Sequence, residues 1–511
     1  MNYSLTILTL VPLLGGIVVA GLGSGRKNLV RGLSLFFSLI ALTGAVCLWV
    51  NFNGGSGGLQ FEEVHPWAPS LGIEYHLGID GLGLLMLMLT AIVTPLAILV
   101  SWSMDDRPHV YHALILWLQA GLFGTFTALN FVHWFMFWEL GLIPAFFLIK
   151  LWGGPNRGPA ATQFFIYTMV GSVTLLLSFL AISVATGSFD FIDLAGMAKS
   201  GVLAAKLHAT FGWQNVGLII FAGAFLGFAV KVPVVPFHTW LPAAYSEAPS
   251  AVTMLLTGVM SKMGVYGFLR ILLPIFPDQI RQVLTPLLWL AVATIVLSAC
   301  AAFAQRDLKR MLAYSSVNHL GYCLLAMFAA VGAATGVARP ELQKAAALDG
   351  VLLQMFNHGL TASALFLFVA LLEKRSDGLR GLDDFGGLRK VVPVFTGLMG
   401  IALFSSLGLP GLNGFIGEFL VFKGVFPLAP WAAAISTVGL LVTAIFLLTL
   451  IQRVFCGPLN SRWAQLPDLS TRERFLVLPS IALMFVLGIW PQLILGKIDA
   501  TVLKLVQQVG F

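Results

Sequence analysis

Long apolar runs recur along the whole chain, separated by short polar stretches. Five clear runs are Leu84–Val100, Val216–Val230, Leu284–Phe303, Val351–Leu372 and Phe475–Leu495. Each run is close to the roughly 20 residues that a helix needs to cross about 30 Å of hydrocarbon. The pattern predicts an all-α polytopic membrane protein, and its polar loops are too short to form an enzyme domain.

The same pattern, followed from end to end, predicts about 14 transmembrane helices. Their expected extents are residues 3–21, 30–50, 79–101, 113–130, 132–151, 162–185, 216–237, 250–272, 285–303, 308–330, 346–372, 392–427, 431–455 and 475–496. Proline and glycine interrupt the seventh and the twelfth of these spans, and both residue types break membrane helices.

The two interrupted spans lie five apart, which indicates an internal repeat. Because five is odd, a five-helix unit that repeats along the chain must have the inverted orientation, and broken helices at matching positions are typical of an ion pathway. The predicted division is residues 1–112 for three helices and an external loop, 113–272 and 285–455 for the two five-helix repeats, and 456–511 for the last helix and a tail.

Composition and charge support a membrane protein and give it an orientation. Hydrophobic residues make up 58% of the 511 residues and charged residues 10%, against about 25% charge in soluble domains. Eighteen lysines and arginines fall in loops on one predicted side and eight on the other, and residues 51–78 contain none. The positive-inside rule then places both termini outside. The net charge of +7 needs no nucleic acid to explain it.

Six ionisable residues remain within apolar spans after the loops are removed. An unpaired charge at the bilayer centre costs about 2.5–3.5 kcal/mol on insertion scales, so these groups must be paired, hydrated or neutral. Any one of them could be a structural ion pair, and the histidines could be neutral hydrogen-bond partners between helices. Their recurrence on successive spans favours a proton relay through Glu139, Lys231, Lys262, His319, His358 and Glu418.

The stretch GFAVKVPVVPFHTWLP, residues 227–242, places Lys231 directly before a helix break at Pro233 and Pro236. Non-helical backbone at membrane depth is tolerated only where it is buried in protein or lines water. We expect water to reach Lys231 there, with Glu139 as its partner. Moving that carboxylate would change the proton affinity of the lysine, and protons would pass by Lys262 and the histidines to Glu418.

Four motifs stand out along the chain: FWELGLIPAFFLIKLWGG, AVKVPVVPFHTWLPAAYSEAPS, SKMGVYGFLRILLPIFP and AQRDLKRMLAYSSVNHLGY. They resemble the antiporter-like subunits of respiratory complex I. The glutamate in GLPGLNGFIGEF further resembles the M-type group, whose mitochondrial counterpart is the fourth ND subunit; L-type and N-type relatives usually carry lysine there. One departure is Tyr245, which stands where the family commonly has histidine.

The resemblance implies a proton-translocating subunit in the membrane arm of a NADH:quinone oxidoreductase. Glu139 and Lys231 would be the coupling pair and Lys262 the central relay. His319 and His358 would be further relay groups and Glu418 the terminal site.

The resemblance also implies the surroundings of the chain. No cofactor is expected in this chain, because the iron–sulfur clusters, FMN and quinone belong to partner subunits. L-type and N-type neighbours, lipids and a bacterial inner (plasma) membrane are implied as well. Alternatives are a multisubunit cation/proton antiporter, a photosynthetic or hydrogenase-linked relative of complex I, and a structural scaffold.

Overall fold

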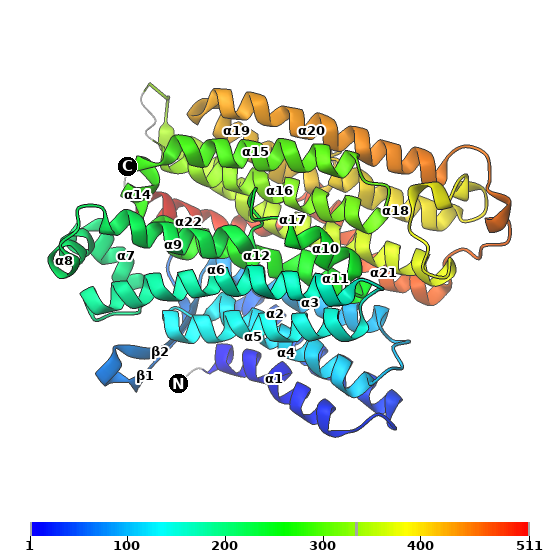
Figure 1. The fold of residues 1–511 in the computed structure, drawn as a ribbon, viewed down its shortest axis with the longest axis horizontal. Coiled ribbons are helices and arrows are strands. Elements are labelled where there is room, and N and C mark those ends of the chain that lie inside the picture. The colour runs from blue at the N-terminus through cyan, green and yellow to red at the C-terminus, as the bar shows by residue number, and fades with distance from the viewer. Residues whose placement is uncertain (1–2, 333–335, 509–511) are drawn as a thin grey trace.

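The computed structural model describes residues 3–332 and 336–508. The two chain ends, predicted to be external, lie outside these ranges. Most of the helices run along the longest axis of the molecule (Figure 1). The first helices are α1 (Ser4–Gly21), α2 (Lys27–Asn51), α3 (Gly81–Val100), α4 (Pro108–Thr127), α5 (Phe131–Trp152) and α6 (Arg157–Thr186).

The middle of the chain contains two broken or irregular spans. The first is α9 (Val216–Lys231), which is followed after a turn by α10 (Trp240–Glu247). In the second, π-helical turns interrupt one continuous rod and leave α12 between them. Its parts are α11 (Ser250–Leu255), η2 (Leu256–Met260), α12 (Ser261–Gly267), η3 (Phe268–Leu272) and α13 (Leu273–Ile275), with α14 (Pro277–Gln282) after it.

The second half of the chain also contains a broken span, between α18 and α19, and a π-helical turn, η6. Its longest helix, α17, crosses the centre of the bundle and packs closely on α19 and α16. The elements are α15 (Leu284–Phe303), α16 (Leu308–Val331), α17 (Pro340–Arg375), η4 (Leu382–Asp384), η5 (Leu388–Lys390), α18 (Pro393–Ser406), α19 (Asn413–Leu428), α20 (Pro430–Leu450), η6 (Ile451–Phe455), η7 (Ser461–Trp463), α21 (Thr471–Ile489) and α22 (Gln492–Gln508).

The class predicted from the sequence is confirmed, but the number of spans differs. Of the described residues, ten helices are long and apolar enough to cross a membrane, or up to twelve if two bent helix pairs are each counted as one span. The prediction was 14. The shortfall falls on α16, which carries many polar residues, and on the two short helices α18 and α19, which replace the predicted span 392–427. Spans that are broken are too short, and spans that carry polar groups have too low a mean hydropathy, to be counted by helix length and hydropathy alone.

Both predicted helix breaks are present. Helix α9 ends at Lys231, and α18 ends seven residues before Asn413 begins α19. The last predicted span, residues 475–496, is wrong at its end. Helix α21 stops at Ile489 and α22 leaves it at 64°, because Pro491 cannot continue the helix.

A small extramembrane layer covers the end of the bundle that carries the β-hairpin, as Figure 1 shows. Strands β1 (Gln60–Ala68) and β2 (Ile73–Ile79) pair antiparallel, joined by η1 (Pro69–Leu71), and helices α7 (Phe191–Lys199) and α8 (Val202–Phe211) lie at the same end. The sequence reading expected an external loop at residues 51–78 and did not predict the hairpin or these two helices.

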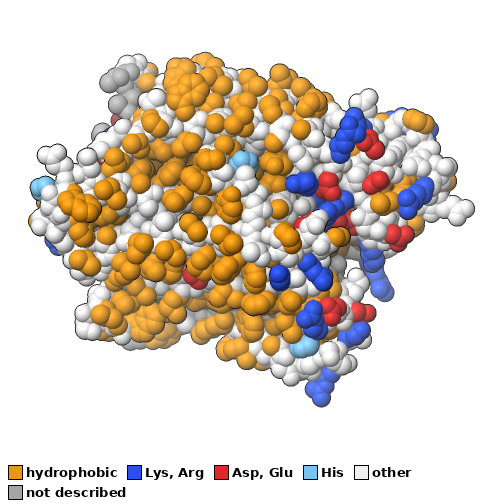
Figure 2. All heavy atoms as spheres, viewed as in Figure 1, with side chains coloured by type: hydrophobic (Ala, Val, Ile, Leu, Met, Phe, Trp, Pro, Cys, Tyr) orange, Lys and Arg blue, Asp and Glu red, His pale blue; other side chains and the backbone are white. Residues whose placement is uncertain are grey.

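Charged and apolar side chains are sharply segregated on the face shown in Figure 2. Apolar side chains cover the middle of the molecule, and lysine, arginine and acidic side chains gather at the end opposite the hairpin. This is the distribution of a protein whose middle contacts lipid and whose two ends contact water.

Candidate functional site

Lys231 lies at the last turn of α9 with only 2% of its surface exposed. Its Nζ is 4.9 Å from the ring centroid of Trp138 on α5, a cation–π distance. Trp138 is itself oriented by a 3.0 Å hydrogen bond from Nε1 to Ser172 Oγ on α6. The aromatic ring therefore provides the closest favourable contact for the lysine charge.

Glu139, the residue after Trp138, does not contact Lys231. No ion pair within 4 Å joins the two side chains in the part of the chain that the structure describes. Glu139 Oε1 and Lys231 Nζ are buried and have no hydrogen-bond partner within the described protein. The sequence reading made these two residues direct partners; the structure places them as separated neighbours, with Glu139 only half-buried.

A small cavity lies beside Lys231. It is lined by Lys231, Tyr245 and Ser261, among others, and Ser261 immediately precedes Lys262. The Tyr245 hydroxyl donates a 3.0 Å hydrogen bond to the carbonyl of Leu256, at the start of the π-helical turn. Tyr245 thus stands beside the lysine at the position where histidine was expected, and it offers a hydroxyl instead of an imidazole.

Lys262 is fully buried on α12. Its Nζ donates a 2.5 Å hydrogen bond to the carbonyl of Thr257 and lies 2.8 Å from Nδ1 of His358 on α17. Thr257 belongs to the π-helical turn η2, which changes the pairing of backbone carbonyls just before the lysine. The irregular turn therefore provides one acceptor for the ammonium group, and the imidazole provides the other.

The chain of contacts continues from His358 to Glu418. The ring centroids of His358 and His319 are 5.1 Å apart, and His319 Nδ1 is 2.9 Å from Glu418 Oε1. Gln354 donates from Nε2 to the same carboxylate oxygen at 3.3 Å, and Ser406 Oγ is 3.3 Å from His319 Nε2. These side chains line one small cavity, so four of the six predicted residues form a continuous file.

The second helix break positions Glu418. The chain leaves α18 through Gly408, at φ 81°, and Gly411, at φ 94°, conformations that favour glycine. Asn413 then begins α19, and its carbonyl accepts a 2.7 Å hydrogen bond from Asn357 Nδ2 on α17. This junction places Glu418, little more than one turn into α19, against His319.

Several polar members of the file were missed by sequence reasoning. Gln354 is one turn before His358 on α17, a spacing that puts both on one face of the helix. That spacing is a signal that the sequence did contain. Ser406 and the Thr257 carbonyl carry no such signal, because their roles depend on distances between helices.

An ion cluster lies at the end of the bundle opposite the hairpin and joins the two halves of the chain. Lys309 Nζ is 3.3 Å from Glu373 Oε1. Arg380 contacts Asp307 at 2.6 Å and Glu247 at 3.7 Å. Glu247 ends α10 in the first half, and the other members belong to the second half.

Residues 3–332 and 336–508 contain no group of three or more histidine, cysteine, aspartate or glutamate side chains that could hold a metal ion. The groups gathered in the file are amines, imidazoles, a carboxylate and neutral hydrogen-bonding side chains.

Fold and site together define a class: a polytopic membrane protein with a buried line of neighbouring protonatable groups. The family profile described as "NADH:quinone oxidoreductase/Mrp antiporter, TM" matches residues 128–445. NADH-quinone oxidoreductase subunit M of Rhodobacter capsulatus is 35% identical over 99% of this chain and 97% of its own length. F(420)H(2) dehydrogenase subunit M of Methanosarcina mazei is also 35% identical, over 96% and 95% of the two chains.

A solved structure gives the same assignment. A chain in respiratory complex I from Thermus thermophilus with bound NADH matches with a TM-score of 0.85 and 27% identity, covering 99% of this chain and 100% of that one. The chain belongs to the transmembrane family of NADH:quinone oxidoreductases and Mrp antiporters, as an M-type, antiporter-like member.

Proposed function

We propose that the chain moves protons in the membrane arm of a NADH:quinone oxidoreductase by means of the buried file from Lys262 to Glu418, with Lys231 delivering protons to it. The observation that supports this most directly is the series Lys262–His358–His319–Glu418, whose three contacts all join titratable side chains. A scaffold would not need titratable groups in contact with one another at this depth, since each one is costly to bury.

The geometry suggests how one proton moves along the file. The Lys262 ammonium donates along its 2.8 Å contact to the lone pair of His358 Nδ1. If both groups were charged, two unit charges 2.8 Å apart would repel by about 6 kcal/mol at an effective dielectric constant of about 20. The pair therefore holds one excess proton in preference to two, and adding a proton at one end favours release at the other.

His319 connects the imidazole pair to the terminal carboxylate. Its Nδ1 faces Glu418 and its Nε2 faces Ser406. A proton that arrives at His319 can pass to Glu418 across 2.9 Å, while the Ser406 hydroxyl offers a hydrogen bond to the other ring nitrogen. Gln354 steadies the carboxylate oxygen that receives the proton.

Glu139 and Lys231 are the proposed coupling pair. Because Glu139 is half-buried on α5 and has no ion-pair partner within the described protein, its position and charge are free to respond to a neighbouring subunit. A shift of Glu139 towards Lys231 would favour the ammonium form, and a shift away would favour release of the proton towards Lys262.

The proposed setting is a bacterial plasma membrane, with the hairpin end and both termini external. L-type and N-type antiporter-like subunits are the expected neighbours. The iron–sulfur clusters, FMN and quinone site would lie in other subunits. Residues 113–272 and 285–455 would be the inverted repeats, and the file would cross from one to the other at Lys262–His358.

A second candidate is a subunit of a cation/proton antiporter, because the family description includes Mrp antiporters. The full-length similarity to subunit M of quinone oxidoreductases and the glutamate at position 418 favour the first function. An electron donor other than NADH for the parent complex is a further alternative, since one relative is an F(420)H(2) dehydrogenase subunit.

The test uses the assembled complex in proteoliposomes with a dye that reports internal pH. We expect Glu139→Gln and Lys231→Ala each to reduce coupled pumping sharply while assembly is kept. Lys423→Ala, on the exposed face of α19, is the matched control and should pump normally. If both coupling-pair variants assemble and pump normally, the assignment of the pair is wrong; pumping that requires sodium would favour the antiporter.

A further inference from the structure

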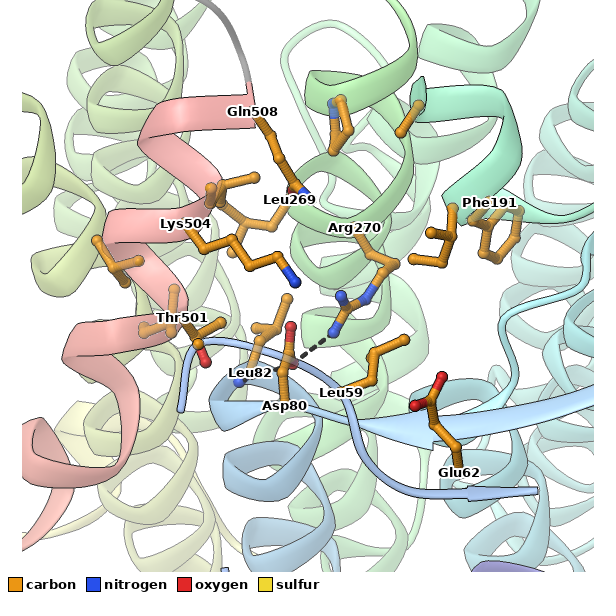
Figure 3. Close-up of a pocket in the computed structure, with 17 residues that line it drawn as sticks. Leu59, Glu62, Asp80, Leu82, Phe191, Leu269, Arg270, Thr501, Lys504 and Gln508 are labelled. Carbon is orange, nitrogen blue, oxygen red and sulfur yellow. Dashed lines mark hydrogen bonds and ion pairs between the residues drawn. The ribbon is translucent and has the colours of Figure 1, made fainter. Parts of the chain in front are cut away.

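A pocket opens at the hairpin end of the bundle, separate from the relay file. Its volume is about 220 Å³. Figure 3 shows Asp80, Arg270 and Lys504 converging on it from three different elements, with Leu82 and Leu269 beside them. The pocket therefore has a polar wall formed by α3, η3 and α22, and it has room for several water molecules.

The polar wall is built around one ion pair. Arg270 is 2.5 Å from Asp80 Oδ1, and their side chains are 11% and 9% exposed. Asp80 also caps α3 by accepting hydrogen bonds of 3.1 Å from the amides of Leu82 and Gly83. Arg270 Nε donates to the Tyr266 hydroxyl at 3.3 Å. The mouth of the pocket is thus a fixed feature of the fold and not a chance gap between loops.

The pocket and the relay share the same helices. Arg270 comes eight residues after Lys262 on one continuous rod, and Leu352 comes six residues before His358 on α17. At about 1.5 Å per residue, the pocket floor is only about 9–12 Å from the relay along the helix axes. On the third helix, α3, Leu82 lines the pocket and Leu89 packs against Gly359, next to His358.

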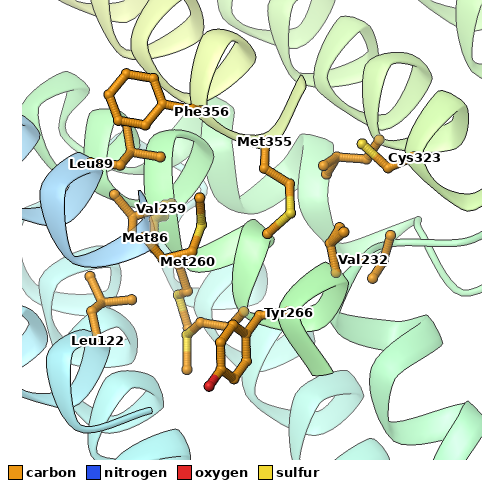
Figure 4. Packing of buried hydrophobic residues seen from close by; sticks show 14 of the residues in the cluster. Met86, Leu89, Leu122, Val232, Val259, Met260, Tyr266, Cys323, Met355 and Phe356 are labelled. Atoms are coloured by element: carbon orange, nitrogen blue, oxygen red, sulfur yellow. The ribbon is translucent and has the colours of Figure 1, made fainter. Parts of the chain in front are cut away.

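Buried apolar side chains occupy the helix positions between the two levels, and Figure 4 shows some of them packed together in the core. Met86, Met355 and Phe356 are among them and are at most 3% exposed. Methionine side chains are flexible and adapt readily to changes in packing, and apolar constrictions of this kind gate pores by excluding or admitting water. About two helical turns, with mainly apolar side chains between them, therefore separate the central lysine from a pocket that can hold water.

We propose that this pocket is an external mouth for the central lysine, and that the layer of Met86, Met355 and Phe356 is its gate. The inference rests on the proposed proton relay. When the layer parts, water reaches Lys262, the ammonium transfers a proton to water, and the resulting amine is reprotonated from the Lys231 side. Asp80 attracts the hydrated proton at the mouth, and Arg270 keeps Asp80 in place while the gate is closed.

The first test measures water access to the layer. In a background with Cys47, Cys300, Cys323 and Cys456 replaced by serine, Met86→Cys is treated from outside with a membrane-impermeant methanethiosulfonate, at rest and during turnover. Labelling should be at least about tenfold faster during turnover, because a thiol reacts only when water admits the reagent. Lys504→Cys, at the mouth, should label in both states, and Val93→Cys, two turns deeper on α3, in neither. Equal labelling of Met86→Cys in both states would overturn the gate.

The second test removes the charge at the mouth and keeps the helix cap. Asp80→Asn retains an N-cap residue, because asparagine caps helices as well as aspartate does. We expect pumping to fall by about tenfold or more, as when a proton acceptor is lost. Asp190→Asn is the matched control, since Asp190 is a buried N-cap of α7 at the same end, and it should pump normally.

Lys262→Ala, measured in parallel, separates the two hypotheses. If Lys262→Ala abolishes pumping and Asp80→Asn pumps like wild type, the hypothesis of an external mouth is wrong and the hypothesis of the relay is kept. If Lys262→Ala pumps normally, the relay itself is wrong, and the mouth that depends on it is wrong too.

Discussion

Carbonyl, amide and imidazole groups hold the two ends of the file. Lys262 contacts a carbonyl and an imidazole, and Glu418 contacts an imidazole and an amide. A permanent ion pair with lysine or arginine at Glu418 would fix the charge, since breaking a buried pair is costly. A carbonyl or an amide stabilises a charge less strongly than an opposite charge does, so the proton remains transferable.

Gln354 allows this argument to be tested at one side chain. Its Nε2 donates to Glu418, and a hydrogen bond to a charged group contributes about 1.5–3 kcal/mol. Gln354→Leu should therefore slow pumping by about tenfold to 100-fold, because each 1.36 kcal/mol is a factor of ten. Gln119→Leu replaces another fully buried glutamine, on α4, that makes no contact with the file, and it should leave the initial pumping rate unchanged. Equal pumping rates for the two variants would show that Gln354 takes no part in the relay.

The buried ionisable residues that lie together could be identified from the sequence, but their distances could not. A charge or imidazole in an apolar run is conspicuous because it is costly there, and this identified Lys262, His319, His358 and Glu418. Glutamine and serine are common at helix contacts in membranes, so Gln354 and Ser406 were not distinctive. The separation of Glu139 from Lys231 depends on how α5 packs on α9, which no local pattern encodes.

At the scale of elements, the break between α18 and α19 is fixed by close backbone packing. A Cβ on Gly414 would collide with the carbonyl oxygen of Ser405, a rigid backbone atom. Gly414→Ala should lower stability by about 1–3 kcal/mol, the usual cost of overpacking, and should displace Glu418 from His319. A lower midpoint temperature and reduced pumping are the expected readouts.

Gly397→Ala is the matched control for this break. Nothing lies within 4 Å of a Cβ placed on Gly397 in α18, and alanine is favoured over glycine in a helix interior by up to about 1 kcal/mol. Its midpoint temperature should be unchanged or higher. A similar loss in both variants would mean that glycine flexibility, and not the contact with Ser405, shapes the junction.

The β-hairpin should be stabilised at low pH through His76. Burial lowers the pKa of His76, but the hydrogen bonds and charges of Asp190 and Glu62 raise it by more, so its pKa lies above the ordinary 6.5. The folded state therefore favours the protonated form. This stabilisation is complete below the unfolded pKa of about 6.5 and is lost as the pH rises through the folded value.

Hydrogen-exchange protection factors of β2 should thus be larger near pH 6 than near pH 8, on either side of the unperturbed histidine pKa of about 6.5. His76→Gln should remove the difference. His208→Gln, at an exposed position on α8, should keep it. A pH dependence that survives in His76→Gln would assign the effect to another group.

Elements outside the membrane were the ones that sequence reasoning missed. Hydropathy identifies long apolar helices well, but β1 and β2 are short strands, and α7 and α8 have only 9 and 10 residues. The π-helical turns around Lys262 have no sequence signature of their own, because packing on neighbouring helices decides the hydrogen-bond pattern. The two breaks were predictable because proline and glycine mark them directly.

At the scale of the whole molecule, the arrangement of charge predicts which end of the bundle faces the cytoplasm. The basic loops and the hairpin lie at opposite ends of the bundle (Figures 1 and 2), so the positive-inside rule makes the hairpin end external. Two exposed serines test this orientation: Ser70 in η1, at the hairpin, and Ser24, between α1 and α2. In the background without native cysteines, a membrane-impermeant maleimide added to intact cells should label Ser70→Cys and not Ser24→Cys. Inverted vesicles should give the reverse. Labelling of Ser24→Cys in intact cells would invert the orientation, and the pocket at Asp80 and Arg270 would then open to the cytoplasm.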